Sequence, residues 1–150
     1  MFEIQNTKEI PLLRVNAHVF KHSKFGCTHL HLDCDSTEKA FSVAFRTIPK
    51  DHSGIAHILE HTVLCGSEKF PVRDPFFMMT RRSLSTFMNA MTYPDITAYP
   101  FATLNDKDFR NLLSVYLDAA FFPNIDELDF MQEGHRFELI KDGDKEKLAL

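Results

Sequence analysis

Two histidines and one glutamate are spaced so that they can serve a single metal ion. His57 and His61 stand four positions apart, and Glu60 directly precedes the second histidine. On a helix, residues i and i+4 project about 40° apart on one face, and residue i+3 falls in the same arc. The two imidazoles can then bind one divalent cation, while the carboxylate can reach a water molecule on it. The arrangement favours metal-assisted hydrolysis, in which Zn²⁺ lowers the pKa of its water toward about 7 and a carboxylate takes the proton.

The same residues also allow a simpler interpretation, a helix with two partly exposed histidines and a solvated glutamate. The segment around them is largely apolar, however, with aliphatic residues at positions 55, 58, 59, 63 and 64. Three polar groups on such a helix need partners, because burial of an unpaired polar group costs free energy. A bound metal supplies a partner, so the metal site is the favoured interpretation.

Local patterns predict the helices that would carry this motif and its surroundings. A helix is expected over residues 53–65, where Ser53 can cap the start and Gly66 can end it. Residues 74–82, which open with Asp-Pro, are expected to form a second, short helix.

Alternating and apolar segments predict antiparallel strands. The first three strands are interpreted as a meander, and a Pro94-Asp95 turn joins the last two. The expected strands cover residues 12–22, 27–33, 40–45, 84–93 and 96–103.

The clearest helical pattern in the chain follows position 105. Asn105 or Asp106 can cap this helix, and Pro123 ends it. Its apolar residues recur at i, i+3, i+4 and i+7 and form one continuous stripe. The stripe consists of Phe109, Leu112, Leu113, Tyr116, Leu117, Ala120 and Phe121.

A further helix is expected over residues 126–139, with Leu128 and Met131 facing inward, and a turn is expected at 142–144. Taken together, the elements predict an α+β fold in which an antiparallel sheet has helices packed on one face. The sheet is expected to be incomplete at the C-terminus, where the chain reaches what looks like the start of another strand.

Length and composition exclude several classes of protein. The chain has 150 residues, which is room for one domain, and its 44% of hydrophobic residues argues against disorder. A formal net charge of −4 argues against nucleic acid as a partner, and no apolar run is long enough to predict a membrane span. Three cysteines are an odd, small number, which indicates a reducing compartment rather than a disulfide framework.

One strand segment offers a second conceivable metal site. Cys27, His29, His31 and Asp33 alternate along it and would share one face. A solvent-facing polar side is the favoured interpretation, because ligands on a single strand splay too widely for one tetrahedral metal. Cys65, which follows the His57–His61 motif, is interpreted as a buried small hydrophobe.

The order His-x-x-Glu-His is the inverse of the commoner zinc-protease pattern and is typical of inverzincins. The chain resembles the pitrilysin/insulinase family of metallopeptidases, and within it the presequence-protease branch. The resemblance covers nearly everything from His18 to Glu138. The segments that carry it are residues 41–47, 57–66 (HILEHTVLCG), 73–77 (RDPFF), 84–92, 111–122 (NLLSVYLDAAFF), 127–130 and 132–136.

The resemblance implies roles for particular residues. His57 and His61 would be zinc ligands and Glu60 the general base. Residues 89–91, which are Asn89, Ala90 and Met91, would lie on an edge strand that binds peptide by strand addition. The implied substrates are short unstructured peptides taken into a closed chamber, which Phe76 and Phe77 could line unless they belong to the core.

The resemblance also implies parts that this chain does not contain. Family members have four similar domains, so residues 1–150 are interpreted as the N-terminal part of the first, catalytic domain. The third zinc ligand is a glutamate on a later helix and is expected beyond Leu150. Glu133 and Glu138 are nearby carboxylates, but neither is assigned as this ligand. We therefore expect the isolated chain to have weak or no peptidase activity.

Two other classes of function stay open at this point. S-ribosylhomocysteine lyase has a similar inverted motif, but it needs a later cysteine, and no cysteine follows Cys65 here. A non-catalytic, protease-like structural subunit would be expected to lose the metal residues, which this chain keeps. With no targeting segment recognised, the expected location is the cytoplasm of a bacterium or the matrix of a eukaryotic organelle.

Overall fold

The structure is a computed structural model that describes residues 1–135, 138–142 and 145–149. The chain divides into two compact units, Met1–Thr37 and Glu38–Leu150. The second unit contains the His57–His61 motif. Within the described residues, no helix has both the length and the hydrophobicity needed to cross a membrane.

The first unit is a three-stranded antiparallel sheet in the order β1-β2-β3. The strand expected from residue 12 begins later than predicted, because Pro11 opens a short 3-10 turn that contains Leu12 and Leu13. Arg14 then takes a left-handed conformation with φ of 53° and reverses the chain. The sequence pattern did not predict strand β1, which precedes this turn. It pairs with β2, the strand that follows the turn. The elements are β1 (Phe2–Ile10), η1 (Pro11–Leu13), β2 (Val15–His22) and β3 (Thr28–Cys34).

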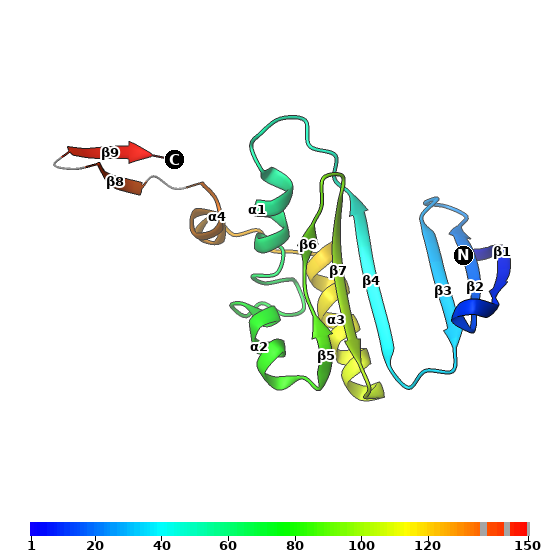
Figure 1. Ribbon diagram of the computed structural model, residues 1–150. Coiled ribbons are helices and arrows are strands. Elements are labelled where there is room, and N and C mark those ends of the chain that lie inside the picture. The colour runs from blue at the N-terminus through cyan, green and yellow to red at the C-terminus, as the bar shows by residue number, and fades with distance from the viewer. Residues whose placement is uncertain (136–137, 143–144, 150) are drawn as a thin grey trace. The chain divides into compact units, whose positions relative to one another are not determined.

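The second unit is built on a four-stranded antiparallel sheet with β7 at its centre (Figure 1). The expectation that residues 40–45 continue the N-terminal meander is wrong, because this strand pairs with β7 instead. Phe41 lies opposite Phe101 and Val43 opposite Tyr99, so the strand adds one apolar face to the core. The strands are β4 (Lys39–Arg46), β5 (Ser85–Met88), β6 (Met91–Thr92) and β7 (Ile96–Thr103).

The long helix α3 (Asp106–Phe121) lies along this sheet and contacts β4 and β7 (Figure 1). The side chain of Asn105 caps it by accepting hydrogen bonds from two backbone N–H groups, each at 3.0 Å. Leu112 and Tyr116 are fully buried against the sheet, as the stripe predicts. Near the C-terminal end of α3 the buried face differs from the predicted apolar stripe, because Ala119 is buried and Phe121 is exposed.

Two short helices precede the edge strands. Helix α1 (Ile55–Thr62) begins after Gly54, whose φ of 69° suits a residue without a side chain. Ser53 is not the cap that the sequence suggested, because Gly54 occupies the N-cap position and no side chain of the described residues bonds to the first turn. Helix α2 (Pro75–Arg82) has proline at its first position, as expected.

Helix α4 (Glu127–Glu133) is shorter than the predicted helix over residues 126–139. The side chain of Asp126 caps it at 2.8 Å, but Gly134 ends it and residues 138–142 form strand β8. The inward placement predicted for Leu128 and Met131 is wrong, since both side chains are mostly exposed. Strand β8 (Glu138–Asp142) pairs with β9 (Lys145–Ala149), and the turn predicted at 142–144 falls largely outside the described residues.

Candidate metal centre

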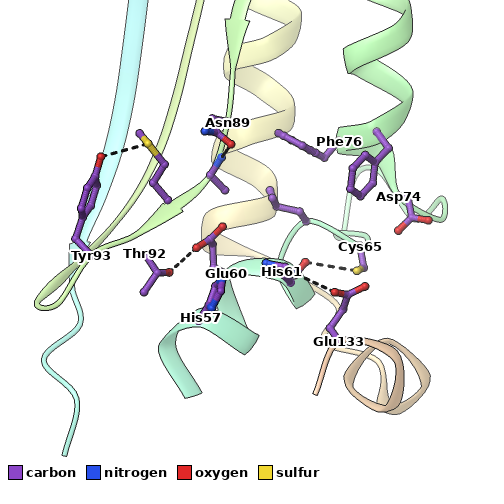
Figure 2. Close-up of a pocket in the computed structure, with 14 residues that line it drawn as sticks. His57, Glu60, His61, Cys65, Asp74, Phe76, Asn89, Thr92, Tyr93 and Glu133 are labelled. Atoms are coloured by element: carbon purple, nitrogen blue, oxygen red, sulfur yellow. Dashed lines mark hydrogen bonds and ion pairs between the residues drawn. The ribbon is translucent and has the colours of Figure 1, made fainter. Parts of the chain in front are cut away.

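Helix α1 brings both histidines and Glu60 to one side, where it contacts β6 (Figure 2). The rings of His57 and His61 meet edge to face with their centroids 4.9 Å apart. Ligand atoms of the three side chains all lie within 4.8 Å of one another, which is close enough for the group to hold a metal ion. Two imidazoles are suitable ligands for a divalent metal ion, and the Glu60 carboxylate lies beside them, so these residues fit such an ion.

Glu60 differs from the two histidines in its surroundings. Its side chain is buried at 5% exposure, and Oε2 accepts a hydrogen bond of 2.5 Å from the hydroxyl of Thr92 on β6. The Thr92 hydroxyl lies 3.4 Å from that of Thr97, which is 2.8 Å from that of Thr47. A line of threonine hydroxyls therefore extends from the carboxylate across β6 and β7 to Thr47, the residue after β4. Sequence spacing did not reveal this contact, because Thr92 lies 32 positions from Glu60.

His61 has a carboxylate partner that sequence analysis did not assign. Its Nδ1 lies 2.8 Å from Oε2 of Glu133, the last residue of α4 (Figure 2). The other oxygen of Glu133 accepts a hydrogen bond of 2.8 Å from Gln132. These bonds, first the one from His61, lower the pKa of Glu133, so the carboxylate is ionised at neutral pH.

The three motif residues open into a cavity of about 540 Å³. Phe76 and Phe77 from α2 form part of its wall, with their rings 5.4 Å apart. Phe77 is mostly exposed and lines the cavity only. Phe76 lines the cavity and also packs on the buried core. The remaining lining residues are Leu64, Cys65, Asp74, Asn89, Ala90, Met91, Thr92, Tyr93 and Glu133.

The wall opposite α1 is the interrupted edge of the sheet, where Asn89 and Ala90 separate β5 from β6. The N–H of Ala90 donates to the side chain of Asn89 at 3.0 Å, and the N–H of Asn89 donates to β7 at 3.1 Å. The hydroxyl of Tyr116 donates to the backbone carbonyl of Asn89 at 3.3 Å, which ties the edge to α3. Burial raises the pKa of Tyr116, so this hydroxyl keeps its proton. Asn89, Ala90 and Met91 thus lie on the cavity wall.

A comparison with models of protein families shows the family to which this chain belongs. The model described as "Insulinase (Peptidase family M16)" matches residues 46–142, which is more than half of the chain. The chain belongs to this family.

Curated relatives agree with the M16 assignment. The chain is 56% identical over 138 residues to "Presequence protease, mitochondrial" of Candida albicans and 57% identical over 137 residues to that of Mus musculus. The Schizosaccharomyces pombe protein of the same name is 51% identical over 144 residues. These matches cover 91% to 96% of the chain but only 13% to 14% of the relatives, so the chain spans a small part of their length.

Solved structures confirm an M16-type fold. The crystal structure of pitrilysin superposes with a TM-score of 0.74 at 21% identity, over 88% of this chain and 14% of that one. A protease from Helicobacter pylori gives a TM-score of 0.67 at 21% identity, over 78% of this chain and 28% of that one. The α+β prediction, with an antiparallel sheet and packed helices, is therefore confirmed.

Cys65 lies beside the His57–His61 motif but is held as a thiol. Its Sγ is 3.5 Å from the backbone carbonyl of His61, and the residue is 8% exposed. Burial, followed by the nearby carboxylates of Asp129 and Asp74, raises the pKa of Cys65 to about 12. The buried role predicted from the sequence is confirmed.

The second metal site considered for this M16 chain does not form. His29 and His31 stack with their centroids 6.5 Å apart on β3, and both are exposed. Cys27 precedes β3 and is also exposed. Among the residues that the structure describes, the three motif residues on α1 make the one group close enough to share an ion.

Proposed function

We propose that this chain is the metal-binding part of a zinc metalloendopeptidase that, in the full-length protein, hydrolyses short unstructured peptides. The observation that carries the proposal is a buried Glu60 held between two exposed histidines, at a cavity whose opposite wall is a sheet edge. Membership of an insulinase-type peptidase family supports it.

His57 and His61 would hold the zinc ion through one nitrogen each. Bound zinc supplies a Lewis acid and a water molecule of lowered pKa. Glu60 takes a proton from the attacking water and passes it to the leaving amine, as a general base and then a general acid. The hydroxyl of Thr92 fixes the carboxylate in one orientation for both steps.

The sheet edge suits an extended peptide. Asn89 and Tyr93 donate their N–H groups to β7, at 3.1 and 2.8 Å. Because backbone groups alternate along a strand, those of Ala90 and Thr92 point outward, and an added peptide would replace the side chain of Asn89 as the acceptor of the Ala90 N–H. A peptide added as a further strand would pair with these groups beside Asn89, Ala90 and Met91, and only an unfolded segment can offer its backbone in this way.

The remaining domains of the full-length protein are proposed partners of this segment. A third zinc ligand, a glutamate on a helix beyond Leu150, would complete the site, because two histidines leave a zinc ion short of its usual three protein ligands. The isolated chain is therefore expected to be weakly active or inactive. Since the curated relatives are named as mitochondrial, we infer the mitochondrion as the location.

The proposal is tested on the full-length protein with an unstructured peptide that carries a fluorophore and a quencher. We expect cleavage that stops on chelation, returns with Zn²⁺, and is abolished by Glu60→Gln while bound zinc stays. Glu68→Gln, an exposed residue of the same type, is the matched control and keeps full activity. Chelator-resistant cleavage, or an active Glu60→Gln variant, would overturn the proposal.

The same assay addresses the two alternative functions. A structural subunit would bind no zinc and cleave nothing, although retention of His57, Glu60 and His61 argues against that. A lyase of the S-ribosylhomocysteine type would act on a thioether sugar derivative and leave peptides intact, but the M16 match gives it no support.

A further inference from the structure

We propose that Glu133 is a positioning residue that fixes the ring of His61 for metal binding, with Gln132 and Arg73 as its supports. This inference rests on the proposed metal site. Glu133 and His61 lie 72 positions apart in the chain, yet their side chains meet at 2.8 Å, which joins α4 to α1 (Figure 2).

The chemistry of this contact selects one form of the imidazole. The carboxylate oxygen that lies 2.8 Å from Nδ1 of His61 acts as the acceptor in this contact, so Nδ1 carries the proton. Nε2 then carries the lone pair and becomes the atom available to a metal. A histidine ligand whose other ring nitrogen donates to a carboxylate has a fixed orientation and a higher basicity.

The contact also places Glu133 on the wrong edge of the ring for a direct ligand. Oε2 faces Nδ1, while a metal on Nε2 would lie at the opposite edge of the imidazole. The second oxygen, Oε1, accepts the hydrogen bond from Gln132 at 2.8 Å. Both oxygens of Glu133 therefore have partners other than a metal ion, and the group of residues close enough to share one does not include Glu133.

A further pair of contacts holds this carboxylate in place. Nη2 of Arg73 donates to Oε1 of Gln132 at 2.7 Å, which turns the amide NH₂ of Gln132 toward Glu133. Arg73 donates to Gln132, and Gln132 in turn donates to Glu133. These hydrogen bonds fix the orientation of the Gln132 amide and of the Glu133 carboxylate. Arg73 comes from the loop between α1 and α2, so three segments converge on His61.

The end of α4 is shaped to present Glu133. Helix α4 stops at this residue, and a Cβ on the following Gly134 would come within 2.6 Å of the carbonyl oxygen of Phe130. Only glycine can occupy that position without a backbone shift. Gly134 thus lets the chain pass close to Phe130 directly after the residue that contacts His61.

The test compares zinc affinity in the full-length protein by competition with a chromophoric chelator. Outer-sphere partners of this kind are worth about 10- to 100-fold in metal affinity, so Glu133→Ala should weaken zinc binding by about that factor. Glu133→Gln keeps a carbonyl acceptor for Nδ1–H but places an NH₂ opposite the donating amide of Gln132, so it should recover only part of the loss. Glu127→Ala, at the exposed start of the same helix, is the matched control and should bind as the wild type does.

The absorption spectrum of bound Co²⁺ separates a positioning role from direct ligation. We expect the band positions and intensities of the Glu133→Ala protein to match the wild type once the site is filled. If Glu133→Ala and Glu133→Gln lose affinity equally and both change the cobalt spectrum, Glu133 is a ligand and the inference is wrong. Unchanged zinc affinity in Glu133→Ala would also overturn it.

Two further variants test whether a loss of zinc affinity arises from a folding defect. Gln132→Ala and Arg73→Ala leave Glu133 in place and should weaken zinc binding by less than about tenfold, with an unchanged melting temperature. If neither changes zinc affinity, the proposed support of Glu133 is wrong. A wild-type protein that binds zinc no better than His57→Ala would instead refute the proposed function, so the two failures are distinguishable.

Discussion

The hydroxyl of Thr92 lies 2.5 Å from Oε2 of Glu60, so a residue of the edge strand holds the proposed base on the facing helix. The strand that would pair with substrate and the carboxylate that would act on it are thereby joined by one hydrogen bond. Their relative position does not depend on helix α1 alone. Removal of this bond should affect the chemical step more than substrate binding.

Replacement of Thr92 by valine tests this relationship, because valine has nearly the same shape and no hydroxyl. Without this hydrogen bond, worth about 1–3 kcal/mol, the carboxylate is no longer held in one orientation for proton transfer, so we expect kcat to fall by about 10- to 100-fold with KM little changed. Thr92→Ser restores the hydroxyl and should recover most of the activity. Steady-state kinetics on a quenched peptide provide both constants, and a rise in KM alone would contradict the prediction.

The three cysteines should differ sharply in their reactivity. Burial raises the pKa of Cys65 from 9.0 to about 12, whereas Cys27 and Cys34 are exposed. The thiolate is the reactive form, so at pH 8 Cys65 should be alkylated far more slowly than the other two. Its labelling should increase only as the pH rises toward 12, because protonation persists to higher pH in the folded protein.

Iodoacetamide labelling followed by peptide mass spectrometry gives the rate at each cysteine. Denatured protein serves as the control, in which all three thiols should react alike. Rapid labelling of Cys65 in the folded protein at pH 8 would show that the thiol is accessible and ionised, contrary to its buried position.

Stability should depend strongly on Leu112, which is fully buried between α3 and the sheet. Leu112→Ala removes three carbons from a packed core and should lower the free energy of unfolding by about 2–5 kcal/mol. Asn111→Ala changes the neighbouring, exposed position and should have little effect. Urea denaturation followed by circular dichroism compares the two, and similar midpoints would contradict the burial of Leu112.

Local sequence signals were sufficient for the elements that carry the metal motif. Helical spacing placed His57, Glu60 and His61 on one face of α1, and side-chain caps located the starts of α3 and α4. These features depend on residues within four positions of one another. The pairing of strands does not, which is why the partner of β4 was predicted wrongly.

The residues that contact the motif could not be predicted from local sequence patterns, for the same reason. Glu133 lies 72 positions from His61, and Thr92 lies 32 positions from Glu60. Only the folded chain brings them together. The exposed positions of Leu128 and Met131 were also missed, because the apolar spacing predicted one helix over residues 126–139, whereas α4 ends at Glu133.

Strand addition at the edge formed by β5 and β6 predicts a two-residue period in the substrate. Because only every second backbone amide of an added strand faces its neighbour, single N-methyl groups at successive positions should alternate between harmful and tolerated. Loss of one such hydrogen bond is worth about 0.5–1.5 kcal/mol, so kcat/KM should fall by about 2- to 10-fold at the harmful positions. The unmethylated peptide and a peptide methylated far from the scissile bond are the controls. Equal losses at all positions, or none at any, would show that substrate does not pair with the backbone of Ala90 and Thr92.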